Sequence, residues 1–361
     1  MNNMLFEPLA IPPLQIANRI VMSPLTRNRA VEANTPNDLM AEYYSQRAAA
    51  GLIITEGTSP SPNGLGYARI PGLFNQAQVE GWRRVTDAVH ARGGKIFVQL
   101  MHTGRVTQVS NLPAAAEVLG PTAEACPGEM YTDAKGMQPH SRPRAMSQDD
   151  IAHAVGEHVR SAQLAIEAGF DGVELHAANG YLIEQFLNAN VNQRTDEYGA
   201  GIDGRNRFAI EVARATAAAI GAQRVGIRLS PYGVFNSTGP FADVDAQYLA
   251  LTQQLSELGL LYVHLLDHSA MGAPAVPAEL KARLRAAFKG LLIVAGGFDR
   301  ASAERALEAG QADLIAFGRP FIANPDLVAR LRTDAALNVL DPETFYTPGA
   351  KGYTDYPVLA A

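Results

Sequence analysis

Eight short runs of apolar residues recur along the chain and constrain its fold more than any other feature. They lie at residues 19–23, 52–56, 95–100, 172–176, 225–230, 261–265, 291–295 and 313–317. Each run is almost continuously apolar, which is typical of a strand buried on both faces. Segments with the apolar spacing of helices separate the runs. The alternation therefore predicts a parallel sheet whose strands are joined by right-handed helical crossovers.

Capping residues mark where several of the helices begin and end. Ser147 and Asp150 form a capping-box pattern at the start of one helical segment. Glycines end four segments: Gly169, Gly221, Gly259 and Gly310. Eight strand–helix units in 361 residues are most economically closed as a (β/α)₈ barrel, a single α/β domain over residues 1–361. A doubly wound sheet is disfavoured, because no Gly-x-Gly-x-x-Gly follows an early strand.

One long segment, residues 104–146, lies between the third predicted strand and its helix and has no helical pattern. It contains five prolines, Pro113, Pro121, Pro127, Pro139 and Pro143. An insertion of this length on a barrel is more often functional than a linker. We expect it to cap the barrel.

Composition excludes several classes of protein. The formal charge of −6 and the absence of a basic stripe argue against a nucleic-acid partner. The single cysteine, Cys126, excludes a disulfide framework and a cysteine-held metal cluster, and we expect no metal site. No apolar run is long enough to span a membrane, and Pro8, Pro12 and Pro13 interrupt any leader-like segment. We expect a cytoplasmic protein, for which a monomer is plausible.

Polar residues interrupt the apolar runs near their carboxyl ends, where barrel enzymes have their active sites. Gln99, His176, Arg228 and His264 are of this kind. A single such residue is usually a satisfied polar group of the core. Several of them at matching depth are better explained by a common ligand that supplies their partners.

The turns after the seventh and eighth runs are rich in glycine, at Gly296-Gly297 and at Gly318-Arg319. Backbone amides without a neighbouring Cβ can approach an anion closely, and barrels bind phosphate at these two turns. Arg319 adds a charge suited to phosphate. Together these residues favour a phosphate site, although either turn alone is equally well explained as a simple change of chain direction.

The sharpest local motif is His176-Ala-Ala-Asn179-Gly-Tyr181. A tight turn after a strand can direct His176 and Asn179 at one oxygen atom, and Tyr181 can face the same cavity. Two donors to a carbonyl or nitro oxygen, with a proton donor nearby, suit an activated, electron-poor alkene.

The chain resembles the old yellow enzymes, the FMN-dependent ene-reductases built on this barrel, over residues 5–357. The resemblance is strongest to their bacterial branch, which includes morphinone reductase, pentaerythritol tetranitrate reductase and N-ethylmaleimide reductase. It rests on five motifs in order, at residues 24–27, 99–105, 176–181, 192–199 and 317–320.

The resemblance implies non-covalent FMN and NADPH or NADH as hydride donor. The residues implied to border the flavin ring are Pro24, Thr26, Gly57, Gln99 and Arg228. Those implied to hold its phosphate are Gly296, Gly297, Gly318 and Arg319. Those implied to line the substrate pocket are Tyr67, Met101, Arg142 and Tyr353, with Met101 at a position where several relatives have Trp.

The implied reaction has two halves that share one site. The nicotinamide reduces the flavin, and flavin N5 then delivers hydride to the β-carbon of an α,β-unsaturated carbonyl, maleimide or nitroalkene. His176 and Asn179 polarise the activating group, and Tyr181 protonates the α-carbon. A nitro, nitrate-ester or quinone reductase using the same site is the alternative.

Two other classes stay open on the residues alone. A phosphosugar isomerase or aldolase on this barrel needs a catalytic Lys or Glu at a strand end, for which Glu56 and Glu174 are available but no central Lys. A non-catalytic flavin carrier leaves His176, Asn179 and Tyr181 without a role.

Overall fold

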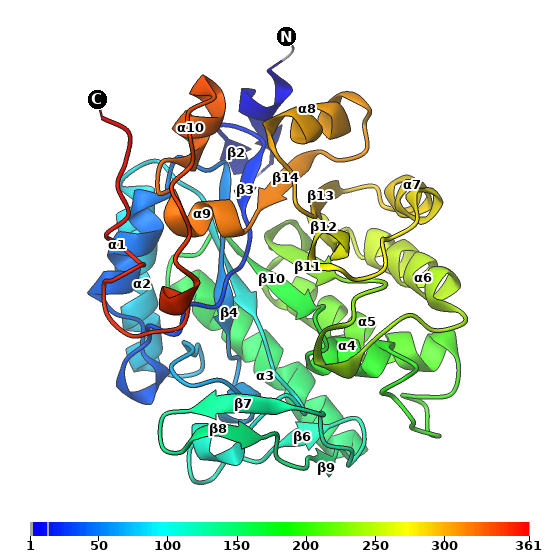
Figure 1. Ribbon diagram of the computed structural model, residues 1–361. Coiled ribbons are helices and arrows are strands. Elements are labelled where there is room, and N and C mark those ends of the chain that lie inside the picture. Colours follow the sequence, from blue (N-terminus) through cyan, green and yellow to red (C-terminus); the bar gives the residue numbers. More distant parts are fainter. Residues whose placement is uncertain (1–2, 13, 361) are drawn as a thin grey trace.

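The computed structural model describes residues 3–12 and 14–360, so Pro13, one of the residues that argued against a leader segment, lies outside the described part. Eight parallel strands close into a barrel in the order β10-β11-β12-β13-β14-β3-β4-β5 (Figure 1). They are β3 (Ile20–Met22), β4 (Leu52–Thr58), β5 (Ile96–Leu100), β10 (Gly172–Ala177), β11 (Val225–Leu229), β12 (Tyr262–Leu266), β13 (Leu291–Ala295) and β14 (Leu314–Phe317). All eight predicted strands are thereby confirmed.

Helices follow every barrel strand and cover the outside of the barrel (Figure 1). They are α1 (Asp38–Gln46), α2 (Gln76–His90), α3 (Gln148–Glu167), α4 (Leu182–Leu187), α5 (Ile202–Ile220), α6 (Val244–Glu257), α7 (Ala278–Ala287), α8 (Arg300–Glu308), α9 (Arg319–Ala323) and α10 (Leu327–Thr333). Short 3₁₀ turns occupy Met4–Phe6, Glu32–Asn34, Pro62–Gly64, Val109–Asn111, Ala222–Arg224, Phe235–Ser237, Ser269–Met271 and Pro342–Thr344. No helix in the described ranges is long and apolar enough to cross a membrane.

The local signals for helix ends are confirmed. Ser147 and Asp150 form both hydrogen bonds of the capping box at the start of α3. The glycines expected to end helices all have positive φ: Gly169, Gly221, Gly259 and Gly310. Glycine adopts this left-handed backbone without the steric cost of a Cβ, which explains why each helix ends where it does.

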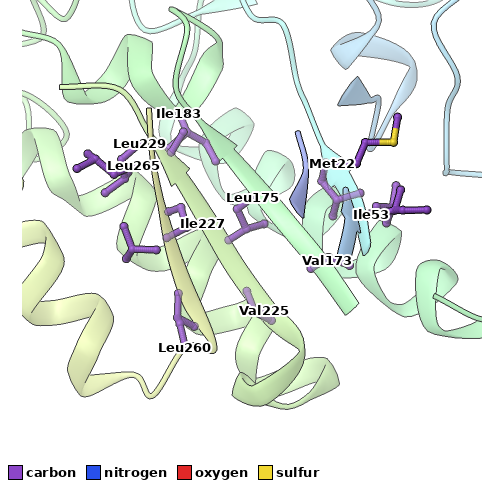
Figure 2. Packing of buried hydrophobic residues seen from close by; sticks show 14 of the residues in the cluster. Met22, Ile53, Val173, Leu175, Ile183, Val225, Ile227, Leu229, Leu260 and Leu265 are labelled. Carbon is purple, nitrogen blue, oxygen red and sulfur yellow. The ribbon is translucent and has the colours of Figure 1, made fainter. Parts of the chain in front are cut away.

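Successive side chains along each barrel strand point alternately outward, into an apolar layer beneath the helices, and inward, into the barrel interior. Leu175, Ile227 and Leu265 lie on neighbouring strands in one buried layer that packs beneath the helices (Figure 2). A second cluster of buried apolar residues fills the interior, and Leu14 and Ile16 of the hairpin β1–β2 (Leu9–Ile11 and Leu14–Ile16) belong to it. The hairpin therefore closes the amino-terminal end of the barrel, and the polar interior residues are left for the other end.

The segment 104–146 has no α-helix, as predicted, and forms two small sheets. β7 (Glu129–Thr132) and β8 (Gly136–Pro139) pair antiparallel, and β6 (Leu119–Gly120) pairs with β9 (Arg144–Ala145). In Figure 1 this insertion lies at the end of the molecule opposite the N-terminus. The insertion follows β5, so this end of the molecule is the carboxyl end of the barrel strands.

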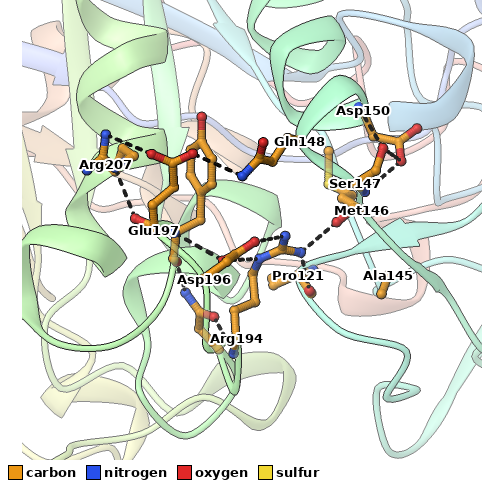
Figure 3. A network of polar contacts seen from close by, with 12 residues as sticks. Pro121, Ala145, Met146, Ser147, Gln148, Asp150, Arg194, Asp196, Glu197 and Arg207 are labelled. Atoms are coloured by element: carbon orange, nitrogen blue, oxygen red, sulfur yellow. Dashed lines mark hydrogen bonds and ion pairs between the residues drawn. The ribbon is translucent and has the colours of Figure 1, made fainter.

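Arg194 connects two points of the insertion, Pro121 and its last residue Met146, to the barrel (Figure 3). Its guanidinium donates to the carbonyls of Pro121 (2.9 Å) and Met146 (2.6 Å) and pairs with Asp196. Arg194 and Asp196 belong to the motif at residues 192–199, which accounts structurally for its presence: it holds the insertion over the site.

Candidate active site

A buried polar layer crosses the barrel interior around Glu174. One oxygen of this carboxylate accepts a hydrogen bond from Gln99 Nε2 (2.8 Å), and the other lies 2.9 Å from His264 Nδ1. Glu174 and His264 are fully buried. His264 therefore braces the carboxylate, and Gln99 is held with its amide group fixed at the level of strands β5 and β10.

Arg228 is the register partner of His176 on β10 and of His264 on β12. Its side chain is buried, and its guanidinium forms no hydrogen bond or ion pair with any residue in the described ranges. Burial lowers its pKa, and Glu174 opposes that shift at longer range. A buried cation without a direct partner is costly. The site therefore fits an anionic or electron-rich ligand edge, such as the pyrimidine edge of reduced flavin.

A bulge in β4 shapes the neighbouring wall. The register between β4 and β5 shifts between Ile54 and Gly57, so that Gly57 pairs with Gln99. A Cβ on Gly57 would lie 2.4 Å from Met101 Sδ, which shows how closely Met101 packs over this glycine. Pro24 is buried and Thr26 is half-buried in the segment after β3.

The turns after β13 and β14 place glycine backbone and the Arg319 side chain at one edge of the site. Gly297 has φ +75°, a conformation that favours glycine, and a Cβ on Gly318 would meet nothing closer than 3.7 Å. Arg319 is exposed, and its contact among the described residues is a 3.6 Å approach to Met271 Sδ. Together with Gly296, these residues form an edge that suits a phosphate group.

The turn after β10 orients His176 and Asn179. The backbone amide of Ala178 donates to His176 Nδ1 (3.3 Å), and burial holds the pKa of the imidazole well below its ordinary value. His176 is therefore neutral, with its proton on Nε2 as a donor. Asn179 has φ +59°, and its carboxamide forms no hydrogen bond within the described part of the chain, where its Oδ1 is buried. Both donors are thus available to a ligand.

Tyr181 lies beside His176, with ring centroids 4.9 Å apart. Its hydroxyl is 3.0 Å from that of Tyr67, and burial raises its pKa to about 12. Asn236, on the loop after β11, donates to the Asn179 carbonyl (2.7 Å) and lies close enough to Tyr181 to lower the pKa of its phenol. The phenol is therefore protonated at neutral pH, and both neighbours lower the cost of forming its phenolate.

The other residues expected in the substrate pocket lie in different surroundings. Tyr353 is fully buried, and its ring stacks on Tyr43 at 4.0 Å with Arg27 and Arg29 against its faces. The described contacts therefore do not join Tyr353 to Tyr181. Arg142 is exposed and donates to the carbonyl of Ala123 in the insertion.

Two residues close to Tyr181 were missed from the sequence. Tyr346 is half-exposed and lies close enough to raise the pKa of both Tyr181 and Tyr67. Asn236 is held in a left-handed conformation (φ +54°) over the turn. No spacing signal connects either residue with the motif at 176–181, since each approaches it from a distant loop.

The glutamates considered for an isomerase are both fully engaged. Glu56 accepts from the backbone amides of Arg27 and Asn28 and from the Tyr44 hydroxyl. Glu174 is held by Gln99 and His264, as above. Cys126 is buried in the apolar cluster that includes Tyr67 and Tyr181, and burial raises the pKa of its thiol.

The buried Arg228, which has no partner among the described residues, and the donors beside Tyr181 suit a flavin-dependent oxidoreductase built on this barrel. The family model for "NADH:flavin oxidoreductase / NADH oxidase" matches residues 4–338. The chain belongs to this family, whose members include the old yellow enzymes.

Relatives and solved structures agree along nearly the full length. A probable flavin mononucleotide-dependent alkene reductase of Leishmania infantum is 43% identical over 365 residues, covering 99% of this chain and 98% of that protein. The 12-oxophytodienoate reductase 1 of Oryza sativa subsp. japonica is 42% identical, covering 98% and 93%. The structure of morphinone reductase matches with a TM-score of 0.95 at 43% identity, covering 99% of this chain and 97% of that one.

Proposed function

We propose that the protein is an FMN-dependent ene-reductase that uses NADPH or NADH to reduce the C=C bond of electron-poor alkenes. The observation that supports this most strongly is the protonated Tyr181 beside His176 and Asn179, whose side-chain N–H groups donate to no residue in the described ranges. The names of the relatives agree, since they describe alkene and 12-oxophytodienoate reductases.

When bound, FMN would supply the two-electron chemistry, which is hydride transfer from the nicotinamide to the alkene. Arg228 would face the pyrimidine edge, where its charge favours the anionic reduced form. Pro24, Thr26, Gly57 and Gln99 would border the ring. The turns at Gly296-Gly297 and Gly318-Arg319 would hold the phosphate.

His176 Nε2 and Asn179 Nδ2 bind the oxygen of the activating carbonyl, imide or nitro group. Withdrawing electron density there makes the β-carbon electrophilic. Tyr181 holds a proton at its Oη and donates it to the α-carbon, and Tyr67 and Asn236 stabilise the phenolate left behind. Met101 and Tyr67 would shape the pocket around the alkene, with Arg142 and Tyr353 in supporting positions farther away.

An anaerobic absorbance experiment on the purified protein tests the proposal. Flavin bands that bleach on addition of NADPH and return on addition of 2-cyclohexen-1-one support it. Bands that bleach but do not return with the enone contradict alkene reduction and favour a nitro, nitrate-ester or quinone acceptor. A protein that stays colourless after FMN is supplied contradicts the flavin site itself.

We also propose that the chain forms a single cytoplasmic domain without a nucleic-acid partner. The closed barrel spanning the sequence, the negative net charge and the single cysteine support this. Size-exclusion chromatography with light scattering determines the oligomeric state, and co-elution with nucleic acid would contradict the proposal.

A further inference from the structure

The turn that presents His176, Asn179 and Tyr181 is held by a buried carboxylate outside the predicted site residues. Glu184, on α4, is 1% exposed. Its Oε2 accepts a hydrogen bond from the backbone amide of Gly180 at 2.6 Å. Gly180 (φ +74°) and Asn179 (φ +59°) are two consecutive residues in the left-handed region, so this part of the backbone depends on such support.

A second hydrogen-bonded path connects the same carboxylate to Asn179. The backbone amide of Asn179 donates to Ser230 Oγ (2.9 Å), and the Ser230 hydroxyl donates in turn to the Glu184 carboxylate (3.0 Å). Tyr248 on α6 donates to Oε1 (3.3 Å). Two successive backbone amides of the turn are therefore hydrogen-bonded to one carboxylate, Gly180 directly and Asn179 through the Ser230 hydroxyl.

The position of Glu184 in its helix explains why Tyr181 is free to act. Tyr181 is the N-cap residue of α4, and its side chain makes no capping hydrogen bond. Glu184 is the third residue of the helix, the position from which a capping-box side chain reaches back to the preceding backbone. Here it binds Gly180, one residue before the N-cap. The helix start is thus stabilised without the Tyr181 hydroxyl, which stays directed at Tyr67.

We propose that ionised Glu184 is a positioning residue that fixes the Asn179–Tyr181 turn in its reactive geometry, so that alkene reduction is lost when this carboxylate is protonated. The inference rests on the proposed ene-reductase function. A protonated carboxyl must use one of its oxygens to bind its own proton, and it then loses an acceptor that Gly180, Ser230 and Tyr248 require.

Among the residues that the structure describes, no cation contacts Glu184. The turn presents the Gly180 amide, the end of β11 presents the Ser230 hydroxyl, and α6 presents Tyr248, whose own pKa is raised well above its ordinary value by burial. Arg205 of α5 is paired with Asp243 and Gln247, and His176 of β10 is neutral. Burial raises the pKa of Glu184 to about 7, with the three donors opposing the shift. The carboxyl consequently titrates within the working pH range.

The test compares wild type with Glu184→Gln in the FMN-loaded enzyme, following reoxidation of the reduced protein by 2-cyclohexen-1-one from pH 5.5 to 8.5. The wild-type rate should fall as the pH falls below about 7. The glutamine variant resembles the protonated form, so its rate should be at least about tenfold lower at pH 8 and converge with wild type at pH 5.5. Reoxidation by dioxygen, which needs neither donor, should be unchanged.

Two further variants separate positioning from damage to the fold. Tyr248→Phe removes one donor to the carboxylate, so the midpoint of the pH profile should move upward by about half a unit. Glu157→Gln alters another glutamate whose pKa is raised by burial, on α3 and away from the turn, and should leave the profile unchanged. A uniform loss of rate at every pH in Glu184→Gln, or an unmoved midpoint in Tyr248→Phe, would overturn the proposal.

Amide hydrogen exchange provides a readout that does not depend on the reaction. Gly180 and Asn179 should exchange faster in Glu184→Gln than in wild type at pH 8. Unchanged exchange at both amides overturns the positioning role even if the enzyme is active. A wild-type protein that fails to reduce the enone contradicts the proposed function instead, and the exchange rates then decide the positioning role alone.

Discussion

Removal of the Tyr181 hydroxyl should separate the two halves of the proposed reaction. In Tyr181→Phe the ring and its packing beside His176 stay, and the variant loses the 3.0 Å contact with Tyr67 Oη. Such a hydrogen bond contributes about 0.5–1.5 kcal/mol, so the fold should persist. A positioned general acid contributes roughly 10²–10⁴-fold to a proton-transfer step, or about 3–5 kcal/mol of barrier.

Stopped-flow absorbance measures each half separately, as bleaching by NADPH and recovery with 2-cyclohexen-1-one. Recovery should slow by about 10²-fold or more, because recovery needs the proton from Tyr181. Bleaching does not need this proton, so its rate should change by less than about threefold. Since the pKa of Tyr181 is about 12, its ionisation should add no step to the pH profile between pH 6 and 9.

Tyr67→Phe is the matched control, because it removes the same hydrogen bond and leaves the Tyr181 hydroxyl in place. It should slow recovery by about tenfold at most, through loss of one group that stabilises the phenolate. Equal slowing of bleaching and recovery in Tyr181→Phe, or equal effects of the two variants on recovery, would refute the proton-donor role.

Three further predictions concern the flavin site, the insertion and the effect of pH on stability. Arg228→Met should weaken FMN binding about 10–100-fold, as measured by fluorescence titration, whereas the exposed Arg214→Met should not; equal affinities would contradict the site. Arg194→Met should speed amide exchange in residues 119–146 and raise KM for the alkene; unchanged exchange would contradict the anchor. Burial lowers the pKa of His158 to about 4 from 6.5, so the unfolded state gains a proton first as pH falls. Between pH 7 and 5, the free energy of unfolding should therefore fall by about 2 kcal/mol less in His158→Gln than in wild type, as measured by urea unfolding at both pH values. An equal fall in the two proteins would contradict the burial of His158 in its neutral form.

Periodicity and capping residues predicted the barrel because both are local properties of the chain. The eight strands are short apolar runs, and the helix ends depend on single residues such as Gly169 or on pairs such as Ser147 and Asp150. The donors at 176–181 could also be predicted from the sequence, since one strand and one turn contain all of them. Closure of the barrel then determines that Gln99, His176 and Arg228 meet at one end.

The contacts between loops could not be predicted in this way. Asn236 reaches the turn through a left-handed backbone conformation that no sequence pattern indicates. Tyr346 approaches Tyr181 because the C-terminal segment is held by Arg27 and Arg29, whose guanidinium groups donate to several of its carbonyls. These interactions depend on the folded arrangement of segments about 320 residues apart. Tyr346 is therefore near enough to raise the pKa of Tyr181, an influence that no local pattern in the sequence indicates.

Deuterium labelling of the product tests the central claim most directly. The enzyme would reduce 2-cyclohexen-1-one with NADPH deuterated at both C4 positions in ordinary water, and with ordinary NADPH in D₂O. The account predicts cofactor deuterium at the β-carbon in the first product and solvent deuterium at the α-carbon in the second. Cofactor deuterium at the α-carbon, or solvent deuterium at both carbons, would contradict the roles assigned to the donor pair and to Tyr181.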